Sequence, residues 1–220
     1  MDGSISHGIQ LVCFDIGRVL LRICDDWPHA CRVAGVTVPA RLAERSKATP
    51  PAASALIHRY DTGEIDLETF AREIAPLSGL TPRDVVRLQE HYLLGAYAGV
   101  AELIDKLGRA GLRTACLSNT SDLHWRMMHD RRSPHYLPLE RMDHCFASHL
   151  VKLRKPAEAI YAHVEKQAGV APQSIVFFDD VEENVEGARR RGWRGCRIDP
   201  QPDDPLPQVR EFLTSLGVHF

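Results

Sequence analysis

Short apolar runs alternate with helical patterns along most of this 220-residue chain, and that alternation limits its possible folds more than any other feature. Apolar residues such as Leu103, Ile104 and Leu107 have the spacing of one buried helix face. Strands that alternate with helices in this way indicate a parallel sheet covered by helices. The sequence therefore predicts an α/β fold, with strands at about 10–14, 113–117, 143–147, 174–178 and 195–198.

The stretch from residue 25 to residue 96 interrupts the alternation. It contains several helix signals in succession and no convincing strand. Asp66 is a typical N-cap, and Gly79 is a typical C-cap thirteen residues later. We therefore predict a core formed by residues 1–24 and 97–220, and a helical cap at residues 25–96 that is inserted after the first strand.

The charge of the chain is nearly balanced, with 27 basic and 29 acidic residues and a net charge of −2. No block of like charges is long enough to bind a polyanion, so nucleic acid is not an expected partner. No apolar run approaches the length of a membrane span, and Asp2 stands where a signal peptide carries basic residues. We expect a cytoplasmic protein without a membrane partner, either a monomer or a homodimer.

Cysteines and histidines form no ligand pattern. The six cysteines include no C-x-x-C pair and are expected to be buried free thiols. The eleven histidines, five of which lie between residues 124 and 149, fit no compact set of zinc ligands and are expected to be solvated. The sequence therefore predicts neither a disulfide framework nor a zinc site.

The first predicted strand ends in Phe14-Asp15-Ile16-Gly17-Arg18, which places a carboxylate at its carboxyl end. Open α/β sheets bind their ligands at that edge. A carboxylate anchored there can act as a nucleophile, and Gly17 leaves its carbonyl free to bind a cation. Taken alone, the segment is more typical of a simple turn, and Arg18 fits substrate contact and a structural ion pair about equally well.

Two further segments carry groups that bind anions. Ser118 and Asn119 follow a predicted strand and precede a helical pattern, a position that holds anions. Lys155 stands directly before Pro156, which we expect to be the first residue of a helix. The positive charge of the lysine would then add to the helix dipole. Taken alone, the first segment is more often a simple helix cap, and the second is more often an exposed lysine.

A fourth segment carries paired carboxylates. Asp179 and Asp180 end a buried strand, and Asn184 follows four residues later. Adjacent carboxylates repel one another unless a cation compensates them, and hard oxygen ligands suit Mg²⁺. Because the four segments occur in order at the ends of separate strands, the sequence predicts a site for phosphate and a divalent metal.

The four segments, FDIGRVL, LSNT, RKPAEAIY and FFDDVEENVEGA, resemble the four motifs of the haloacid dehalogenase superfamily. The match extends from about residue 9 to residue 198. The chain resembles in particular the phosphatases that carry a helical cap between the first two motifs. Residues 60–65 and 117–120 are also similar to bacterial sugar-phosphate phosphatases of the glucose 1-phosphate type. The resemblance implies a Rossmann-like parallel sheet flanked by helices.

The resemblance also implies roles for individual residues. Asp15 would attack phosphorus to form an aspartyl-phosphate that water hydrolyses. The implied catalytic residues are Asp15, Ser118 and Lys155. The implied substrate-binding residues are Gly17, Arg18, Ser118, Asn119 and Lys155. The implied ligands of Mg²⁺ are Asp15, Gly17, Asp179 and Asp180, with Asn184 behind them.

One position departs from the commonest phosphatase pattern, because Gly17 stands where an aspartate usually protonates the leaving group. A positioned general acid accelerates a reaction by about 10²–10⁴-fold. We therefore expect a preference for leaving groups that depart without a proton, such as an anomeric sugar hydroxyl or a phenol. His29, His58 and Asp61 of the cap are candidates to supply the proton, although surface placement fits each of them better.

The predicted function is that of a Mg²⁺-dependent phosphomonoester hydrolase acting on small phosphorylated metabolites such as sugar phosphates. A metal-independent 2-haloacid dehalogenase shares the fold and also lacks an acid at the position of Gly17, but the pair Asp179 and Asp180 disfavours it. A catalytically weak phospho-ligand sensor or partner-binding protein is a further alternative, which the missing acid suggests.

Overall fold

A five-stranded sheet forms the centre of the computed structural model, which describes residues 8–43, 50–200 and 204–220. Its strand order is β5-β4-β1-β6-β7, and all neighbouring strands are parallel. The strands are β1 (Leu11–Phe14), β4 (Arg113–Ser118), β5 (His144–Ala147), β6 (Ile175–Asp179) and β7 (Arg194–Arg197). The predicted α/β fold and its five strands are confirmed. The segment around Asp2 lies outside the described residues.

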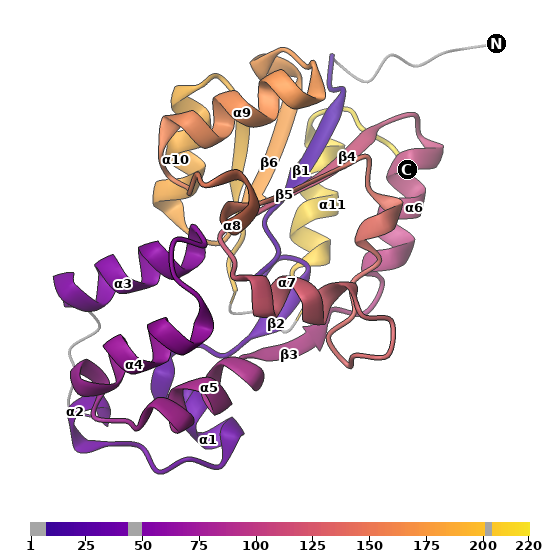
Figure 1. The fold of residues 1–220 in the computed structure, drawn as a ribbon. Coiled ribbons are helices and arrows are strands. Elements are labelled where there is room, and N and C mark those ends of the chain that lie inside the picture. The colour runs from indigo at the N-terminus through magenta and orange to yellow at the C-terminus, as the bar shows by residue number, and fades with distance from the viewer. Residues whose placement is uncertain (1–7, 44–49, 201–203) are drawn as a thin grey trace.

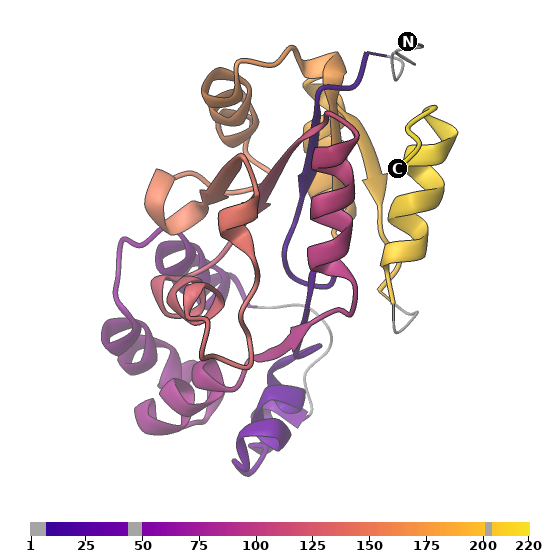
Figure 2. The same cartoon turned by 90° about the vertical axis from the view of Figure 1, so that its right-hand side faces the viewer.

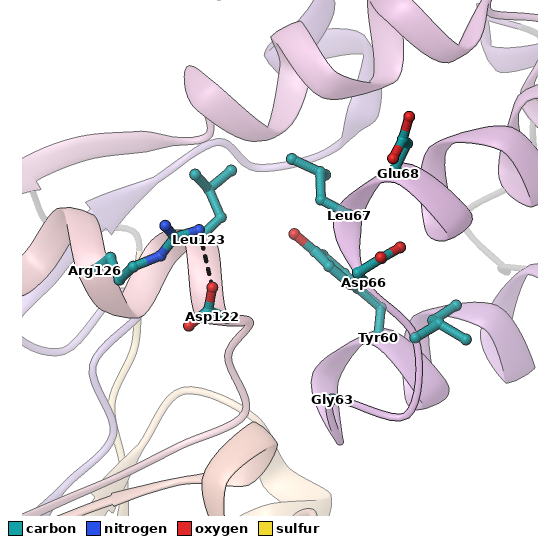
Figure 3. A pocket seen from close by; sticks show the side chains of 9 residues that line it. Tyr60, Gly63, Asp66, Leu67, Glu68, Asp122, Leu123 and Arg126 are labelled. Carbon is teal, nitrogen blue, oxygen red and sulfur yellow. Dashed lines mark ion pairs between the residues drawn. The ribbon is translucent and has the colours of Figure 1, made fainter.

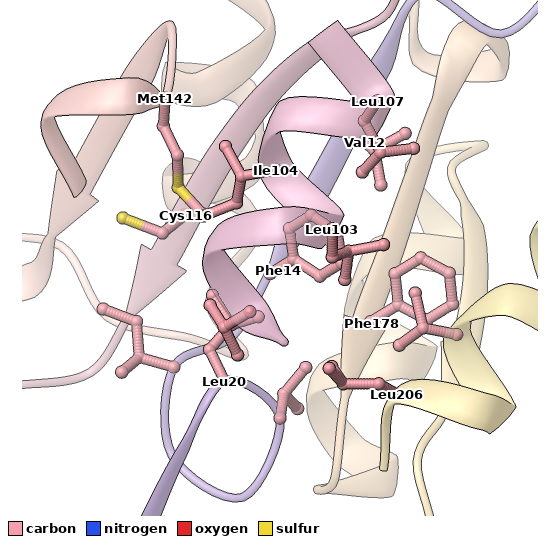
Figure 4. Close-up of a cluster of buried hydrophobic side chains, with 14 of the residues drawn as sticks. Val12, Phe14, Leu20, Leu103, Ile104, Leu107, Cys116, Met142, Phe178 and Leu206 are labelled. Carbon is pink, nitrogen blue, oxygen red and sulfur yellow. The ribbon is translucent and has the colours of Figure 1, made fainter. Parts of the chain in front are cut away.

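Helices cover both faces of the sheet (Figures 1 and 2). The pairs are α6 (Val100–Arg109) with α11 (Leu206–Ser215), and α9 (Glu158–Ala168) with α10 (Glu182–Arg190). Because side chains alternate along a strand, Val12 and Phe14 of β1 join the cluster under α6 and α11. Phe14 stacks on Phe178 there, with ring centroids 5.5 Å apart (Figure 4). Leu11 and Cys13 join the cluster on the opposite face. All four residues of β1 are therefore buried.

Five helices gather at the carboxyl end of the sheet (Figure 1). They are α1 (Trp27–Ala34), α2 (Ala40–Ala43), α3 (Pro51–Asp61), α4 (Leu67–Ser78) and α5 (Pro82–Glu90). This helical layer has an apolar cluster of its own, in which Tyr60 stacks on Phe70. The predicted caps of α4 are confirmed, since Asp66 accepts a hydrogen bond from the Thr69 N–H at 2.8 Å and Gly79 has a φ of 80°.

A two-stranded ribbon joins this layer to the sheet. Its strands, β2 (Leu21–Ile23) and β3 (Leu93–Ala96), are antiparallel. The prediction that residues 25–96 contain no strand was therefore wrong for the last four residues, which form β3. β3 has no β-branched residue and contains Gly95, so its own propensity for a strand is low. β3 forms because its backbone pairs with β2, about seventy residues earlier in the chain, and the local sequence does not indicate this pairing.

The remaining described elements are short. They are the helices α7 (Asp122–His129) and α8 (Ser148–Val151) and the 3₁₀ turns η1 (Leu139–Arg141) and η2 (Pro172–Ser174). Within the described ranges, no helix has both the length and the apolar character needed to cross a membrane. All six cysteines are free thiols, as predicted, and four of them are buried.

His124 of α7 ties the core to the helical layer. Its Nε2 lies 2.8 Å from the Gln89 carbonyl oxygen of α5, and its ring stacks on Tyr92. The expectation that the histidines are solvated was wrong for His124 and for His149, both of which are buried. Burial lowers the pKa of His124 to about 4, although the bond to Gln89 opposes the shift. The helical layer covers α7, and a sequence pattern cannot indicate that packing.

We expect the protein to lose stability as the pH falls through the range of this histidine. Between about pH 6.5 and pH 4 the unfolded chain binds a proton that the folded His124 does not, so the free energy of unfolding falls with falling pH. The full shift corresponds to about 3 kcal/mol. Urea denaturation at several pH values measures this dependence. His124→Gln, which keeps a donor for Gln89, should reduce it, whereas His129→Gln at the exposed end of α7 should not.

Candidate active site

Asp15 stands directly after β1, at the centre of the sheet edge. Its backbone N–H donates to the Phe178 carbonyl at 2.7 Å, which continues the pairing with β6 by one residue. Its Oδ1 accepts a bond from the Ile16 N–H at 2.7 Å. The side chain is thus fixed by the strand behind it and remains partly accessible. This is the position that the sequence predicts for the candidate nucleophile.

Lys155 bridges two carboxylates. Its Nζ lies 2.9 Å from Asp15 Oδ1 and 2.7 Å from Asp179 Oδ2, and only 1% of its side chain is exposed. Burial lowers the pKa of Lys155, but the two carboxylates outweigh this effect and raise it above its ordinary value. The predicted helix start was wrong, because α9 begins at Glu158 rather than at Pro156. The partners of the ammonium are therefore carboxylates and not a helix dipole.

Asp15, Asp179 and Asp180 lie close enough together to share a cation. One oxygen of each lies within 4.8 Å of one oxygen of the others. Asn184 donates to both oxygens of Asp179, at 3.0 and 3.1 Å. Burial, together with the neighbouring carboxylates, raises the pKa of Asp15 and of Asp180. Three crowded carboxylates offer oxygen atoms only, which fits a hard divalent cation such as Mg²⁺.

The residues after β4 lie beside Lys155. Ser118 ends β4 and is buried. The side-chain amide of Asn119 is engaged by the backbone of Lys155. Its Nδ2 donates to the Lys155 carbonyl at 3.0 Å, and its Oδ1 accepts from the Lys155 N–H at 2.9 Å. In this structure Asn119 therefore orients the lysine loop, a contact that its place in the sequence does not reveal.

Asp61, at the end of α3, is a candidate proton donor, together with His29 and His58. It connects the helical layer to the segment that carries Lys155. Its Oδ2 accepts a bond from Arg154 Nε at 3.0 Å, and its carbonyl accepts one from the Ser148 hydroxyl at 2.5 Å. Burial raises the pKa of Asp61, and Arg154 opposes the rise. The predicted surface placement was wrong for Asp61. It holds for His58, which is exposed, while His29 pairs with Asp25 at 3.1 Å.

A pocket lies between the turn that follows α3 and the first turn of α7 (Figure 3). The Tyr60 side chain points from the helical layer toward α7, and Asp122 and Arg126 of α7 form an ion pair at 2.9 Å on the other side. None of the carboxylates that surround Lys155 lines this pocket. No sequence pattern indicates this pocket, because its walls come from segments about sixty residues apart.

Most of the chain matches one known protein family. The family model of a haloacid dehalogenase-like hydrolase matches residues 9–192. The chain belongs to this family. A phosphatase of Mycobacterium tuberculosis is 30% identical to this hydrolase over 152 residues, which cover 69% of the chain and 67% of the relative. An (S)-2-haloacid dehalogenase of Burkholderia cepacia is 31% identical over 113 residues, which cover 51% and 47%.

Solved structures share the fold of this hydrolase. A HAD-like family hydrolase of Porphyromonas gingivalis superposes with a TM-score of 0.74 at 24% identity, covering 93% of this chain and 98% of that one. A HAD family enzyme of Bacteroides thetaiotaomicron, crystallised with magnesium and inorganic phosphate, gives 0.70 at 21% identity, covering 89% and 96%. These likenesses establish the fold of the hydrolase core together with its helical layer.

Removal of the Lys155 charge should destabilise the metal-free hydrolase. Lys155→Met leaves Asp15 and Asp179 without their shared cation, and the loss of one partner from a buried ion pair costs about 3–5 kcal/mol. Urea denaturation in chelator measures the loss. Lys106→Met removes a lysine from an exposed helical ion pair and should cost less than about 1 kcal/mol. Equal losses in the two variants would contradict the assignment.

Proposed function

We propose that this hydrolase is a Mg²⁺-dependent phosphomonoester hydrolase that works through an aspartyl-phosphate. The observation that carries the proposal is the placement of Asp15 at the end of the central strand, in contact with a buried lysine and beside two further carboxylates. The similarity to a phosphatase of Mycobacterium tuberculosis, and the magnesium and phosphate in the Bacteroides thetaiotaomicron enzyme, support it.

In the proposed reaction, a carboxylate oxygen of Asp15 attacks phosphorus, and the bond from phosphorus to the leaving-group oxygen breaks. Water then attacks the acyl-phosphate, which releases inorganic phosphate and restores the carboxylate. Lys155 neutralises charge on Asp15 and on the transferring group. Ser118 and Asn119 would bind phosphate oxygens, Ser118 with its hydroxyl and Asn119 with its backbone N–H, since its side-chain amide holds the Lys155 loop.

Four groups would hold the metal: the carboxylates of Asp15, Asp179 and Asp180, and the carbonyl of Gly17. When bound, Mg²⁺ supplies positive charge that offsets the carboxylates and the phosphate. Lys155 by itself cannot balance three carboxylates. Burial, together with the neighbouring carboxylates, raises the pKa of Asp15 and of Asp180, and the repulsion among the three carboxylates is the electrostatic reason for a cation here. Asn184 and the Val181 N–H orient Asp179 through hydrogen bonds.

The helical layer is proposed to act as a cap, with residues 25–96 as the cap and residues 1–24 and 97–220 as the core. Its position at the carboxyl end of the sheet supports this division (Figure 1). Asp61 anchors the layer next to the lysine loop, since Arg154 immediately precedes Lys155. We propose that a cap in this position admits a small phosphorylated metabolite, such as a sugar phosphate, and excludes a macromolecule.

Dehalogenation of 2-haloacids is the second candidate, because a haloacid dehalogenase is 31% identical over about half of this chain. The two reactions share an aspartate nucleophile but differ in their need for metal. Chloride release from 2-chloropropionate in the presence of chelator would favour dehalogenation, whereas phosphate release that stops in chelator would favour the phosphatase.

Substitution of the nucleophile should abolish phosphate release. Asp15→Asn keeps the size of the side chain but removes its charge, and we expect turnover of aryl phosphates with Mg²⁺ to fall by about three orders of magnitude or more. Asp105→Asn, which removes an exposed carboxylate that pairs with Arg141, should leave turnover unchanged. Phosphate release by Asp15→Asn at the wild-type rate would rule out the aspartyl-phosphate.

Introduction of an acid at Gly17 should broaden the leaving-group range. The atoms nearest to an added Cβ belong to the Ile23 side chain, with Cδ1 at 3.1 Å, so a side chain fits there if the end of Ile23 shifts by a few tenths of an ångström. Gly17→Asp is expected to raise the turnover of alkyl phosphates by up to about 10²–10⁴-fold and to change that of nitrophenyl phosphate little. Gly17→Asn has nearly the same size but no acidic proton to transfer to the leaving group, and it should raise neither by a comparable factor.

A further inference from the structure

We propose that Arg18 is a catalytic residue that stabilises the developing negative charge on the leaving-group oxygen, in place of the general acid that Gly17 cannot supply. The inference rests on the proposed phosphatase function and names the group that compensates for the missing acid. It assigns to Arg18 a role in the transition state rather than a contact with substrate alone.

The guanidinium of Arg18 is held at the open side of the carboxylate cluster. Nη1 lies 3.2 Å from Asp180 Oδ2, and Nη2 donates to the Asp25 carbonyl at 2.9 Å. The side chains become more accessible in the order Asp179 (0%), Lys155 (1%), Asp180 (9%), Asp15 (13%) and Arg18 (26%). Lys155 therefore contacts Asp15 from the interior, while Arg18 lies on the more accessible side of the cluster, the side from which we expect substrate to enter.

The backbone at Arg18 is unusual. Its φ is 58°, in the left-handed region that glycine adopts most readily. The Arg18 N–H donates to the Leu21 carbonyl at 2.7 Å, which closes a tight loop after Gly17. A glycine would adopt this positive φ with less strain, yet the chain carries an arginine there. Strain that is retained beside a reacting group indicates a function for the side chain.

The charge of Arg18 suits an anionic leaving group. When the bond from phosphorus to oxygen breaks, its electron pair stays on the leaving-group oxygen, which later takes a proton from water. Arginine remains protonated at every relevant pH, so Arg18 can stabilise this oxygen by charge and by N–H donation but cannot protonate it. A cation bound at Asp180 would weaken the attraction that holds Nη1, and would leave that donor available to the oxygen.

The test is the dependence of kcat/KM on the leaving-group pKa, measured for aryl phosphates with uncharged substituents. Arg18→Ala keeps a Cβ, so the strain of the positive φ at this position stays the same. We expect its loss to grow from a few-fold for the nitrophenyl ester to about 10²-fold for the phenyl ester, the scale seen when one oxyanion donor is removed. Arg18→Lys, which keeps the charge but not the planar fork, should give an intermediate slope.

Two further variants separate this role from others. Arg22→Ala removes a nearby arginine that lies over the Tyr97 ring, at 5.6 Å from its centroid, and it should leave the slope unchanged. Gly17→Asp combined with Arg18→Ala should flatten the steepened slope, because the introduced acid protonates the oxygen that Arg18 no longer stabilises. The Mg²⁺ concentration for half-maximal rate is measured for every variant, since Arg18 contacts Asp180.

The outcomes distinguish the Arg18 role from the phosphatase function itself. A loss that is equal for all esters, or a changed Mg²⁺ requirement with an unchanged slope, would show that Arg18 only positions Asp180. If Arg18→Ala lost no kcat/KM on any aryl phosphate, the proposal would also be overturned. Arg18 would then be expected to bind a second anionic group of the natural substrate, which aryl phosphates lack. Absence of turnover by the wild-type protein would overturn the phosphatase function and this role with it.

Discussion

The ammonium of Lys155 is the group on which the rest of the candidate site depends. It lies between Asp15 after the central strand β1 and Asp179 at the end of β6, and it is buried together with Asp179. Two carboxylates at adjacent strand ends would repel each other without it. The lysine therefore allows the sheet edge to carry a concentrated negative charge. That charge makes the edge suitable for a divalent cation and, through the cation, for phosphate.

The lysine loop also couples the site to the helical layer. Arg154 binds the Asp61 carboxylate, and the next residue, Lys155, binds the Asp15 carboxylate. Asn119 holds the backbone of the same loop from the end of β4. A displacement of the helical layer would therefore move Arg154 and Lys155, and so change the electrostatic environment of Asp15. This connection gives a physical route from the helical layer to the Asp15 carboxylate.

Local signals in the sequence predicted what local interactions decide. The five strands and the caps of α4 depend on neighbouring residues, and their predicted positions agree with the structure to within about two residues. β3, by contrast, forms only because β2 pairs with it. The start of α9 was misplaced at Pro156, because residues 155–157 form a turn, in which the Ala157 N–H donates to the Arg154 carbonyl at 3.0 Å, before the helix begins at Glu158.

The sequence by itself determined the α/β architecture and the candidate groups, because strand ends in a parallel sheet meet at one edge whatever the connections between them. It also determined that Gly17 leaves no acid on the first loop. Only the tertiary structure decided how these groups pair: Asp179 with Lys155, Asp180 with Arg18 and Asp61 with Arg154. Such pairs join residues from about 24 to 162 positions apart, and their choice depends on burial and distance, which no local pattern contains.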